Sequence, residues 1–410
     1  MANVSSSNGL EKRPKLRFPG FDEPWKATAF GDLVHEFSDR TKEEDEDTLL
    51  SAAIEGMFLN TELFGHQRGA SNKGYKKIKY GTMVLSTQNL HLGNANVNQR
   101  FEHGMVSPAY KTYDITGCSV DLIAQWIKSE AAKRFFYNAT TVGASVCRRN
   151  VEWDTLYEQP LYLPCLDEQE KVAKFLALLS DRINKQQQYV SALKKYKRGL
   201  LRAYFMTDEW NAHHKWEKCK LGLCCSKIGS GKTPRGGSSV YVDRGVMFLR
   251  SQNVLWGALD ISDVSYIDDE TNKTMLSSEV HSGDVLLNIT GASIGRSCIY
   301  SLNERANVNQ HVCILRLSNG GKEKLLPEFL LQQILSDHIQ QQVMDCQNGG
   351  SREGLNFQQI ADFDIVIPDI AEQRKICGML NAFDCKVISE EKSLNALVCL
   401  RASLMQQLFI

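Results

Sequence analysis

Two long stretches of the chain carry apolar side chains at the spacing of a helix that packs along one seam. From Val172, alternating steps of four and three residues reach an apolar side chain at eight of ten positions, and the same steps from Ile376 do so again. A sustained period of 3.5 residues predicts a coiled coil. The predicted seam residues are Leu176, Leu179, Ile183, Val190, Leu193, Leu200, Leu380, Phe383, Val387, Leu394, Leu397 and Leu404.

The two stretches are copies of one another. Residues 163–205 align without a gap with residues 367–409, and each copy opens on a proline followed by a Glu-Gln pair, as in Glu168-Gln169. Proline before a long run with helical periodicity marks a helix start. Each predicted helix of about 38 residues would be about 57 Å long, which is longer than a globular domain needs and indicates a spacer. The polar exceptions to the seam also correspond: Gln186 with Glu390, and Lys197 with Arg401.

Two blocks of similar length accompany these helices, and both contain short β-rich runs bounded by turn residues, such as residues 81–87 and 283–289. The pentapeptide at residues 95–99 recurs identically at 306–310, and Trp25 precedes a glycine by six residues, as Trp216 does. These matches predict an α+β fold in which two α/β domains alternate with two spacer helices as a tandem repeat. The predicted divisions are a flexible tail (1–19), a first domain (20–162), a central helix (163–206), a second domain (207–366) and a C-terminal helix (367–410).

Composition narrows the class of protein. The chain has 410 residues, 42% hydrophobic and 23% charged, which is the composition of a folded protein with two domains. No apolar run approaches the roughly 20 residues that span a bilayer, and the first 20 residues lack the apolar core of a secretion signal. Twelve cysteines without a Cys-x-x-Cys pair predict reduced thiols in a cytoplasm.

The formal net charge is zero, but the charges are segregated. Residues 63–101 carry six basic side chains and no acidic one, and residues 182–202 carry seven basic side chains and again no acid. Acidic residues gather elsewhere, for example between residues 21 and 50. A neutral protein with this distribution can still present a basic groove, although solvated faces of ordinary helices would give the same pattern.

Motifs that suggest catalysis are incomplete. Residues 229–233 resemble the end of a phosphate-binding loop, but the required earlier glycine is Ser226 and Pro234 follows at once. Residues 291–295 lack the third glycine of a dinucleotide fingerprint. His213, His214, Cys219, Cys224 and Cys225 lie close together, but their spacing is not that of a zinc site. The sequence therefore predicts neither catalytic residues nor a metal site.

The remaining polar, basic and aromatic clusters suit recognition of nucleic acid. Arg and Lys read guanine, Asn and Gln read adenine, and Ser, Thr and Lys hold phosphates. The candidate DNA contacts are Arg68, Lys73, Tyr75, Lys76, Lys77, Gln99 and Arg100 in the first domain, and Lys232, Thr233, Arg235, Arg250, Gln252, Asn253, Thr290, Ser293, Arg296, Gln310 and His311 in the second.

Several of these motifs, in this order, resemble the specificity (S) subunit of type I restriction-modification systems. They are residues 16–25, residues 104–110, residues 229–234, the run 283–296 followed by Asn309-Gln310-His311, and both proline-led Glu-Gln helix starts. The resemblance covers nearly the whole chain from about residue 15. It implies two target recognition domains, separated by two long antiparallel coiled-coil helices in a pseudo-twofold tandem repeat.

The resemblance also implies a division of labour. Each recognition domain would read one half of a bipartite, asymmetric double-stranded DNA target, and the helices would bind two modification subunits. Those partners would carry S-adenosylmethionine and methylate adenine, while restriction subunits would use ATP and Mg. This chain would hold no cofactor, catalyse nothing and work in a bacterial or archaeal cytoplasm. One departure is the basic run at 182–202, whose counterpart at 386–401 is nearly neutral, so the two partner sites are expected to differ.

Two alternatives stay open from the sequence. One is a coiled-coil scaffold that joins proteins without recognising DNA. The other is a nucleotide-binding enzyme built on the glycine-rich loop at residues 229–233.

Overall fold

The computed structural model describes residues 2–3, 12–66, 71–145, 148–205, 216–234, 236–347 and 354–410. It divides into two compact units, Met1–Gln187 with Lys392–Ile410 (unit 1) and Gln188–Glu391 (unit 2). Each unit joins one globular domain to part of both long helices, so the units do not end at the domain boundaries expected from the sequence. No helix within the described ranges is both long enough and apolar enough to span a membrane.

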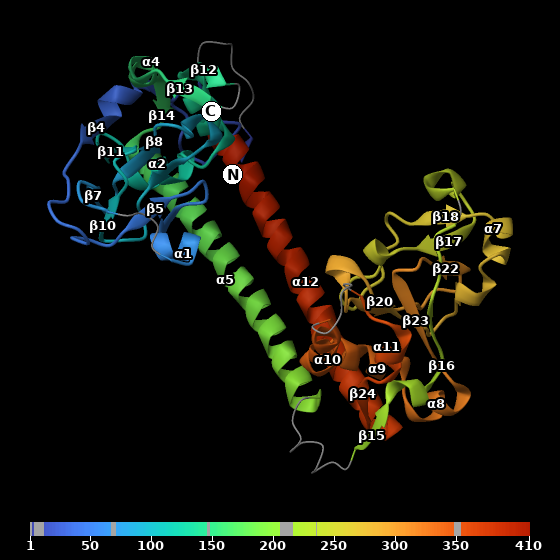
Figure 1. The fold of residues 1–410 in the computed structure, drawn as a ribbon. Coiled ribbons are helices and arrows are strands. Elements are labelled where there is room, and N and C mark those ends of the chain that lie inside the picture. The colour runs from blue at the N-terminus through green and yellow to red at the C-terminus, as the bar shows by residue number, and fades with distance from the viewer. Residues whose placement is uncertain are drawn as a thin grey trace. The chain divides into compact units, whose positions relative to one another are not determined.

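Unit 1 is built on a four-stranded antiparallel sheet with the strand order β4-β11-β8-β9 (Figure 1). Its strands are β4 (Val34–Phe37), β8 (Met83–Ser86), β9 (Ala95–Val97) and β11 (Tyr110–Ile115). The other strands pair two by two: β1 (Ala2–Asn3) with β2 (Leu16–Arg17), β3 (Lys26–Ala29) with β14 (Pro160–Leu163), β5 (Leu50–Ala52) with β6 (Met57–Leu59), β7 (Lys76–Lys79) with β10 (His103–Val106), and β12 (Thr140–Ser145) with β13 (Arg148–Val151).

The short helices of unit 1 are α1 (Asn60–Phe64), α2 (Val120–Trp126), α3 (Glu130–Asn138) and α4 (Trp153–Glu158). Helices α2 and α3 each begin at a serine, Ser119 or Ser129, whose side chain accepts a hydrogen bond from a backbone N–H of the first turn. The buried core contains Trp25, Tyr113 and Phe136 and extends onto the first turns of the central spacer helix.

Unit 2 repeats this plan and adds a second sheet (Figure 1). Its first sheet has the order β16-β23-β20-β21, formed by β16 (Cys225–Ser230), β20 (Val285–Asn288), β21 (Ser297–Ile299) and β23 (Val312–Leu317). The second sheet has the order β18-β17-β22-β19, formed by β17 (Val246–Leu249), β18 (Ser265–Ile267), β19 (Glu279–Val280) and β22 (Ala306–Val308). The remaining elements are the pair β15 (Glu217–Lys220) and β24 (Asp364–Ile367), and helices α7 (Asp269–Lys273), α8 (Asn319–Lys324), α9 (Pro327–Ile334), α10 (Asp337–Gln347) and α11 (Phe357–Ala361).

Strand register identifies the two domains as copies. In unit 1, β11 pairs with β8 so that Tyr110 faces Ser86, and in unit 2, β23 pairs with β20 so that Val312 faces Asn288. The outer strands β9 and β21 pair with β8 and β20 at the same offset. The predicted tandem repeat of two α/β domains is therefore confirmed in the topology of both units.

One match that suggested the repeat is not structurally equivalent. Residues 95–97 form β9, which pairs with β8, whereas residues 306–308 form β22, which pairs with β17 and β19 in the additional sheet. The true counterpart of β9 is β21. Identical pentapeptides take different places because the flanking segments, and not the five residues themselves, decide which strand each one pairs with.

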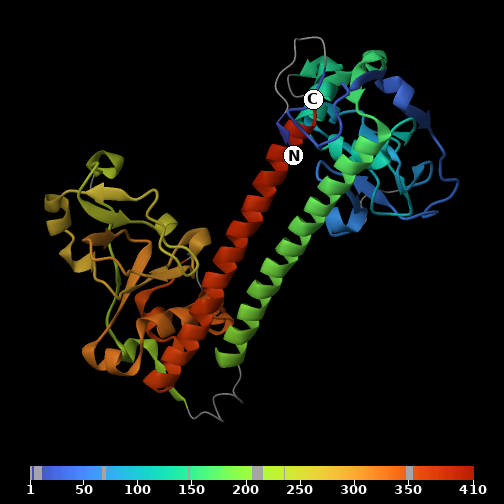
Figure 2. The same ribbon diagram turned by 180° about the vertical axis from the view of Figure 1, so that it is seen from behind.

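The two spacer helices are α5 (Leu166–Phe205) and α12 (Ile370–Leu408). In unit 2 they lie side by side in both views (Figures 1 and 2), and Lys194 contacts Glu391 while Lys197 contacts Asp384. From Lys194 to Lys197 the residue number increases along α5, whereas the number of the partner on α12 decreases from Glu391 to Asp384. The two helices are therefore antiparallel. Every predicted seam residue is buried or half-buried, whereas Leu178, outside the seam, is 61% exposed.

The prediction of a flexible tail over residues 1–19 is wrong for its second half. Strand β2 lies within it, and the Arg17 side chain is only 4% exposed. Arg17 donates two hydrogen bonds, of 2.8 and 2.7 Å, to the carboxylate of Glu168 on α5. A bidentate guanidinium–carboxylate pair fixes a segment because both partners are planar.

Candidate nucleic-acid interface

Four candidate side chains of unit 2 come together in one hydrogen-bonded row. Thr233 Oγ1 donates to Gln310 Oε1, and the Gln310 amide lies 3.0 Å from His311 Nε2. Because that amide nitrogen can only donate, a neutral His311 carries its proton on Nδ1, which faces the hydroxyl oxygen of Thr290. The row leaves the Thr290 hydroxyl hydrogen available to an acceptor outside the protein.

These residues come from three separate loops, which follow β16, β20 and β22. Backbone bonds hold the loops together: Gly231 N–H donates to Asn309 O at 3.1 Å, and Ile289 N–H donates to His311 O at 3.0 Å. Lys232 and Thr233 are exposed and line a cavity of about 610 Å³ with Glu270 of α7. Within the described part of the chain, the Lys232 ammonium group forms neither a hydrogen bond nor an ion pair, so its charge is available to a phosphate.

A second group of candidates lies after β17. Arg250 is half-buried beside the Tyr241 ring, with its guanidinium carbon 5.9 Å from the ring centroid, and its Nε has no hydrogen-bond partner within the described ranges. The exposed Gln252 amide donates to Asp263 Oδ2 at 2.9 Å. Gln252 can therefore present a donor at the surface, whereas the unpartnered Nε of Arg250 is buried, so only the terminal nitrogens of Arg250 could reach a ligand.

Asn253 does not fit the predicted role. It is 2% exposed, its Oδ1 accepts a hydrogen bond from Arg250 N–H, and its amide donates to the backbone oxygen of Asp260 at 2.9 Å. Because both ends of the side chain hold the turn after β17, Asn253 supports the loop and cannot reach a base edge from this position.

Ser293 and Arg296 lie in the turn between β20 and β21, and both are half-buried. Arg296 N–H donates to Ser293 O at 3.2 Å, which closes the turn. Among the described residues, neither side chain forms a hydrogen bond or an ion pair, so both stay candidate contacts.

In unit 1 two of the four described candidate cations, Lys77 and Arg100, are already paired with acids. Lys77 pairs with Glu46, and this partner lowers the pKa of the Glu46 carboxyl to about 2. Arg100 forms a bidentate pair with Glu62 at 2.9 and 2.7 Å, and the Gln99 amide donates to Asp121 at 2.7 Å. These side chains would have to exchange an acidic partner for DNA.

Burial removes one more candidate from the surface. Lys76, on β7, is 6% exposed, and burial lowers the pKa of its ammonium group. Lysine 76 is therefore a poor phosphate contact, contrary to the prediction. Lys73 is exposed and Tyr75 is half-buried in the turn before β7, so both can still contact a ligand. The candidates Arg68 and Arg235 lie outside the described residues.

The structure gives the glycine-rich loop a different purpose from phosphate binding. Gly229 and Ser230 belong to β16 and pair with β23, and the Gly231 N–H is used by Asn309. A Cβ on Gly231 would lie 1.7 Å from the Val308 carbonyl oxygen, so glycine is needed there because β22 passes so closely. A nucleotide phosphate cradle needs a run of free backbone N–H groups, and in this loop the Gly231 N–H is already taken by Asn309 O.

The thiols on β15 and near the start of β16 are buried or half-buried free cysteines. Cys219 and Cys224 lie with their sulfurs 3.8 Å apart, and burial raises the pKa of Cys219 and of Cys225 to about 12. No group of three or more metal-ligating side chains occurs in the described ranges, which do not include His213 and His214.

Sequence reasoning missed several polar residues that organise the domains. Gln125 of α2 accepts a hydrogen bond from Arg401 at 3.0 Å, and Lys128 is held by three oxygen acceptors. Gln125 lies in the apolar helix α2, and Lys128 follows that helix by two residues. A polar side chain at such a position is the local sign that it has a buried hydrogen-bond partner. Their partners are far away in sequence and could not be identified from it.

Comparisons with known proteins agree with this architecture. Residues 215–398 match the family model described as the type I restriction modification DNA specificity domain. The specificity subunit of the type I restriction enzyme MjaVIII of Methanocaldococcus jannaschii is 21% identical over 390 residues, which cover 90% of this chain and 87% of that protein. The EcoBI specificity subunit of Escherichia coli is 24% identical over 301 residues, 64% of this chain and 61% of that protein.

Solved structures share the fold at low identity. The S subunit of a type I restriction-modification system from M. genitalium has a TM-score of 0.57 at 13% identity, covering 97% of this chain and 99% of that one. A chain from a structure of complex assembly and conformational transition of the type I R-M system has a TM-score of 0.58 at 15% identity, covering 96% and 99%.

The duplicated α/β domains and the two long helices make up the fold that this chain shares with the S subunit of a type I restriction-modification system. The chain is similar to specificity subunits of type I restriction-modification systems, over residues 215–398 in the family model and over 90% of its length in the relative from M. jannaschii, as its motifs predict. Specificity subunits are the DNA-recognition components of these systems and are not catalytic, so the reading of this chain as an enzyme is set aside.

Proposed function

We propose that this chain reads a bipartite, asymmetric double-stranded DNA target, with one half-site for each domain. The proposal rests on the observation that the two domains share one sheet topology but carry different loops. The sheets around β8 and β20 share one strand order and register, while the residues on their loops share almost nothing. Two copies of one frame with different contact residues suit two different half-sites held at a fixed separation.

The two readers also differ electrostatically. In unit 2, Lys232 and Arg250 have no acidic side chain as an ion-pair partner among the described residues. In unit 1, Lys77 and Arg100 are paired with Glu46 and Glu62. Surface ion pairs contribute little to stability, so phosphates can replace these acids at small cost.

We further propose that α5 and α12 dock two modification subunits. Outside the seam, both helices expose large apolar side chains, which would suit a surface that binds a partner. The most exposed of these, at about half or more of their surface, are Leu166, Leu178, Tyr196, Ile388 and Leu400. In this proposal the modification subunits carry S-adenosylmethionine and methylate adenine, and restriction subunits carry ATP and Mg. The candidate site residues of this chain act in recognition only.

Sequencing of modified bases in host DNA, with and without this gene, tests the proposal. We expect a bipartite motif of methylated adenine that disappears on deletion. The alternative of a scaffold without DNA recognition predicts an unchanged methylome, and also predicts that the chain, co-purified with its modification subunits, has no salt-dependent affinity for DNA.

A further inference from the structure

The two units have matching positions where the spacer helices meet the globular domain. Gln169 on α5 accepts a hydrogen bond from Ser119 N–H, and Gln373 on α12 accepts one from Leu326 N–H. Because Ser119 and Leu326 donate to these matching glutamines, the two residues correspond. Helix α2 is therefore the counterpart of α9, and α3 is the counterpart of α10. The corresponding residues at the junction are Gln125 with Gln332, Glu130 with Asp337, Ser180 with Asp384, Arg401 with Lys197, and Gln406 with Arg202.

In unit 2 this junction is closed by two ion pairs. Lys197 Nζ of α5 lies 2.5 Å from Asp384 Oδ1 of α12, and Arg202 Nη2 lies 3.1 Å from Asp337 Oδ2 at the start of α10. Each cation therefore has a carboxylate of its own. The first pair joins the two helices and the second joins a helix to the domain.

In unit 1 neither of these carboxylates pairs with the corresponding cation. Ser180 stands in the place of Asp384, and Glu130, in the place of Asp337, has a different partner. Arg401 Nε donates to Ser180 Oγ at 2.9 Å and its Nη2 donates to Gln125 Oε1 at 3.0 Å, so both partners are neutral. Glu130 pairs instead with Lys133 at 2.6 Å. Within the described residues, no carboxylate lies at ion-pair distance from Arg401, and burial lowers the pKa of its guanidinium.

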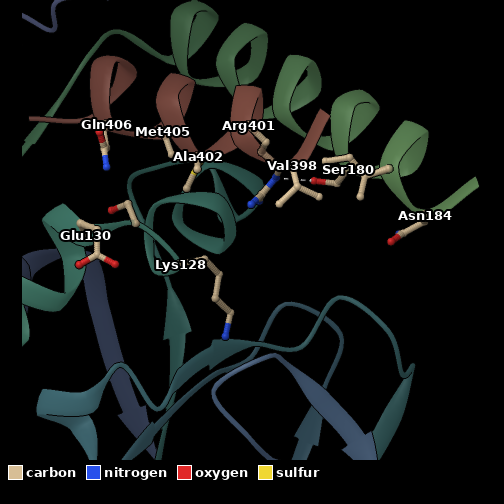
Figure 3. Close-up of a pocket in the computed structure, with 11 residues that line it drawn as sticks. Lys128, Glu130, Ser180, Asn184, Val398, Arg401, Ala402, Met405 and Gln406 are labelled. Carbon is tan, nitrogen blue, oxygen red and sulfur yellow. Dashed lines mark hydrogen bonds between the residues drawn. The ribbon is translucent and has the colours of Figure 1, made fainter. Parts of the chain in front are cut away.

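A cavity of about 440 Å³ lies beside this cation (Figure 3). It is lined by α5 around Ser180 and Asn184, by α12 around Arg401, and by the link between α2 and α3. Figure 3 shows the Arg401 side chain leaving α12 toward Ser180, whereas Lys128 extends away from both helices. Lys128 donates to Ile54 O, Ala95 O and Asn96 Oδ1, so its hydrogens are already used. Arg401 is therefore the cation with donors left for a ligand in this cavity, whose lining also includes Glu130, already paired with Lys133, and the amides of Asn184 and Gln406.

We propose that this cavity of unit 1 is a docking pocket for an acidic side chain of one modification subunit, which pairs with Arg401. The inference rests on the proposed function, because it assumes that modification subunits dock on these helices. A half-buried guanidinium with only neutral partners gains most from a carboxylate, which accepts two of its hydrogen bonds in one plane. In the described part of unit 2, both corresponding cations are already paired, with Asp384 and Asp337. The two docking positions are therefore chemically different.

The substitution Ser180→Asp tests this directly, because it gives Arg401 the internal carboxylate that Lys197 has in unit 2. The chain is co-expressed with its modification subunits, and native mass spectrometry measures the dissociation constants of the first and second subunit. We expect one constant to rise about tenfold, as for loss of a charged hydrogen-bonded pair, and the other to stay unchanged. The melting temperature of the free chain should rise or hold, because Arg401 gains a partner.

Three further measurements decide the interpretation. Ser403→Asp adds the same charge to an exposed position of α12, and an equal loss in that variant would overturn the proposal in favour of bulk charge. Arg401→Met should weaken the same subunit, and the double variant should be no weaker than either single one, whereas additive losses would overturn the proposal. Weaker DNA binding by a fully assembled Ser180→Asp complex would indicate that the cavity holds a phosphate instead.

The outcome for the wild type separates this inference from the function on which it rests. A wild-type chain that binds no modification subunit contradicts the proposed function. A wild-type chain that binds two, together with a Ser180→Asp variant that binds two with the same constants, contradicts only the assignment of the pocket.

Discussion

The two spacer helices share a Glu-Gln pair in their first turn, and only the glutamines of these pairs make equivalent contacts. Gln169 accepts from Ser119 N–H and donates to Pro164 O at 2.8 Å, and Gln373 likewise accepts from Leu326 N–H and donates to Pro368 O at 2.8 Å. The preceding glutamates differ. Glu168 is held by Arg17, whereas Glu372 accepts a hydrogen bond from Trp216 Nε1 at 3.0 Å.

The difference shows which contacts a duplicated fold must keep. The glutamines satisfy buried backbone groups that exist in both copies because the backbone path is the same, and such groups are costly to leave unpaired. A glutamate needs only some donor, so its partner could change. In unit 1 the change leaves the buried Trp25 Nε1 without a hydrogen-bond partner in the described ranges. The predictions below test this distinction, from the largest expected effect to the smallest.

Arg17→Ala should have the largest effect on stability. It removes one partner of an ion pair in which Arg17 is 4% and Glu168 1% exposed, and so leaves a buried carboxylate without its cation. Loss of one member of a buried pair costs on the order of 4 kcal/mol. Hydrogen exchange should show faster opening of residues 163–176 and unchanged protection of residues 367–380.

The matched change in unit 2 is Trp216→Phe, which removes the Nε1 donor to Glu372 and keeps the ring. We expect a loss of about 1.5–3 kcal/mol, because a single hydrogen bond to a charged group is removed. Equal losses for Arg17→Ala and Trp216→Phe would mean that the two glutamates are held in equivalent ways after all.

Stability should depend on pH through Lys128, whose counterpart in unit 2 is Leu335. Burial lowers the pKa of Lys128 to about 8, whereas an unfolded lysine titrates near 10.4. Between these values the unfolded chain binds more protons than the folded one, so the contribution of Lys128 to stability increases as the pH rises from about 8 to about 10.4. Below pH 8 the full penalty, on the order of 3 kcal/mol, is present.

The measurement is urea unfolding at several pH values for the wild type and Lys128→Met. The difference between the two isolates Lys128 from the buried cysteines, whose raised pKa values make stability fall as the pH rises. A difference that does not change between pH 8 and pH 10 would contradict the lowered pKa and the asymmetry between the units.

The shared helix starts give the clearest test of equivalence. Gln169→Ala and Gln373→Ala should each destabilise their own unit by about 2 kcal/mol, because each leaves a backbone N–H and a carbonyl oxygen without a partner. Both losses should be seen by hydrogen exchange at α2 and α9, and the loss at α9 should be the larger because Gln373 also donates to Lys324 O at 2.6 Å. A loss of stability in only one unit would contradict the explanation that both glutamines are kept because they satisfy the same backbone groups.

Much of the fold could be predicted because its determinants are local or repetitive. The seam of α5 and α12 follows from a period of 3.5 residues, and the duplication follows from a fixed offset between residues 163–205 and 367–409. The pentapeptide at 95–99 and 306–310 shows where this fails, since strand pairing depends on flanking segments that the match does not include.

The candidate interface was less predictable for the same reason. Lys76 and Asn253 have suitable chemistry, but their burial depends on segments far away in sequence, as when the Asn253 amide holds the Asp260 carbonyl oxygen. Acids from one segment neutralise cations from another, as with Glu62 and Arg100. Residue type therefore identified the kind of ligand, and only tertiary contacts separate available side chains from occupied ones.

The smallest expected effect concerns the two readers themselves. Lys232→Ala and Arg250→Ala in unit 2, and Lys73→Ala in unit 1, each remove one side chain that has no acidic ion-pair partner among the described residues. Each should weaken DNA binding by the assembled complex by about 1 kcal/mol. The measurement is competition binding with DNA in which only one half-site is mutated. Loss of preference at a single half-site, different for units 1 and 2, sharpens the comparison between the domains, because it assigns each reader its own sequence. If all three variants weaken recognition of both half-sites equally, the domains do not read separately and the difference between their loops has another cause.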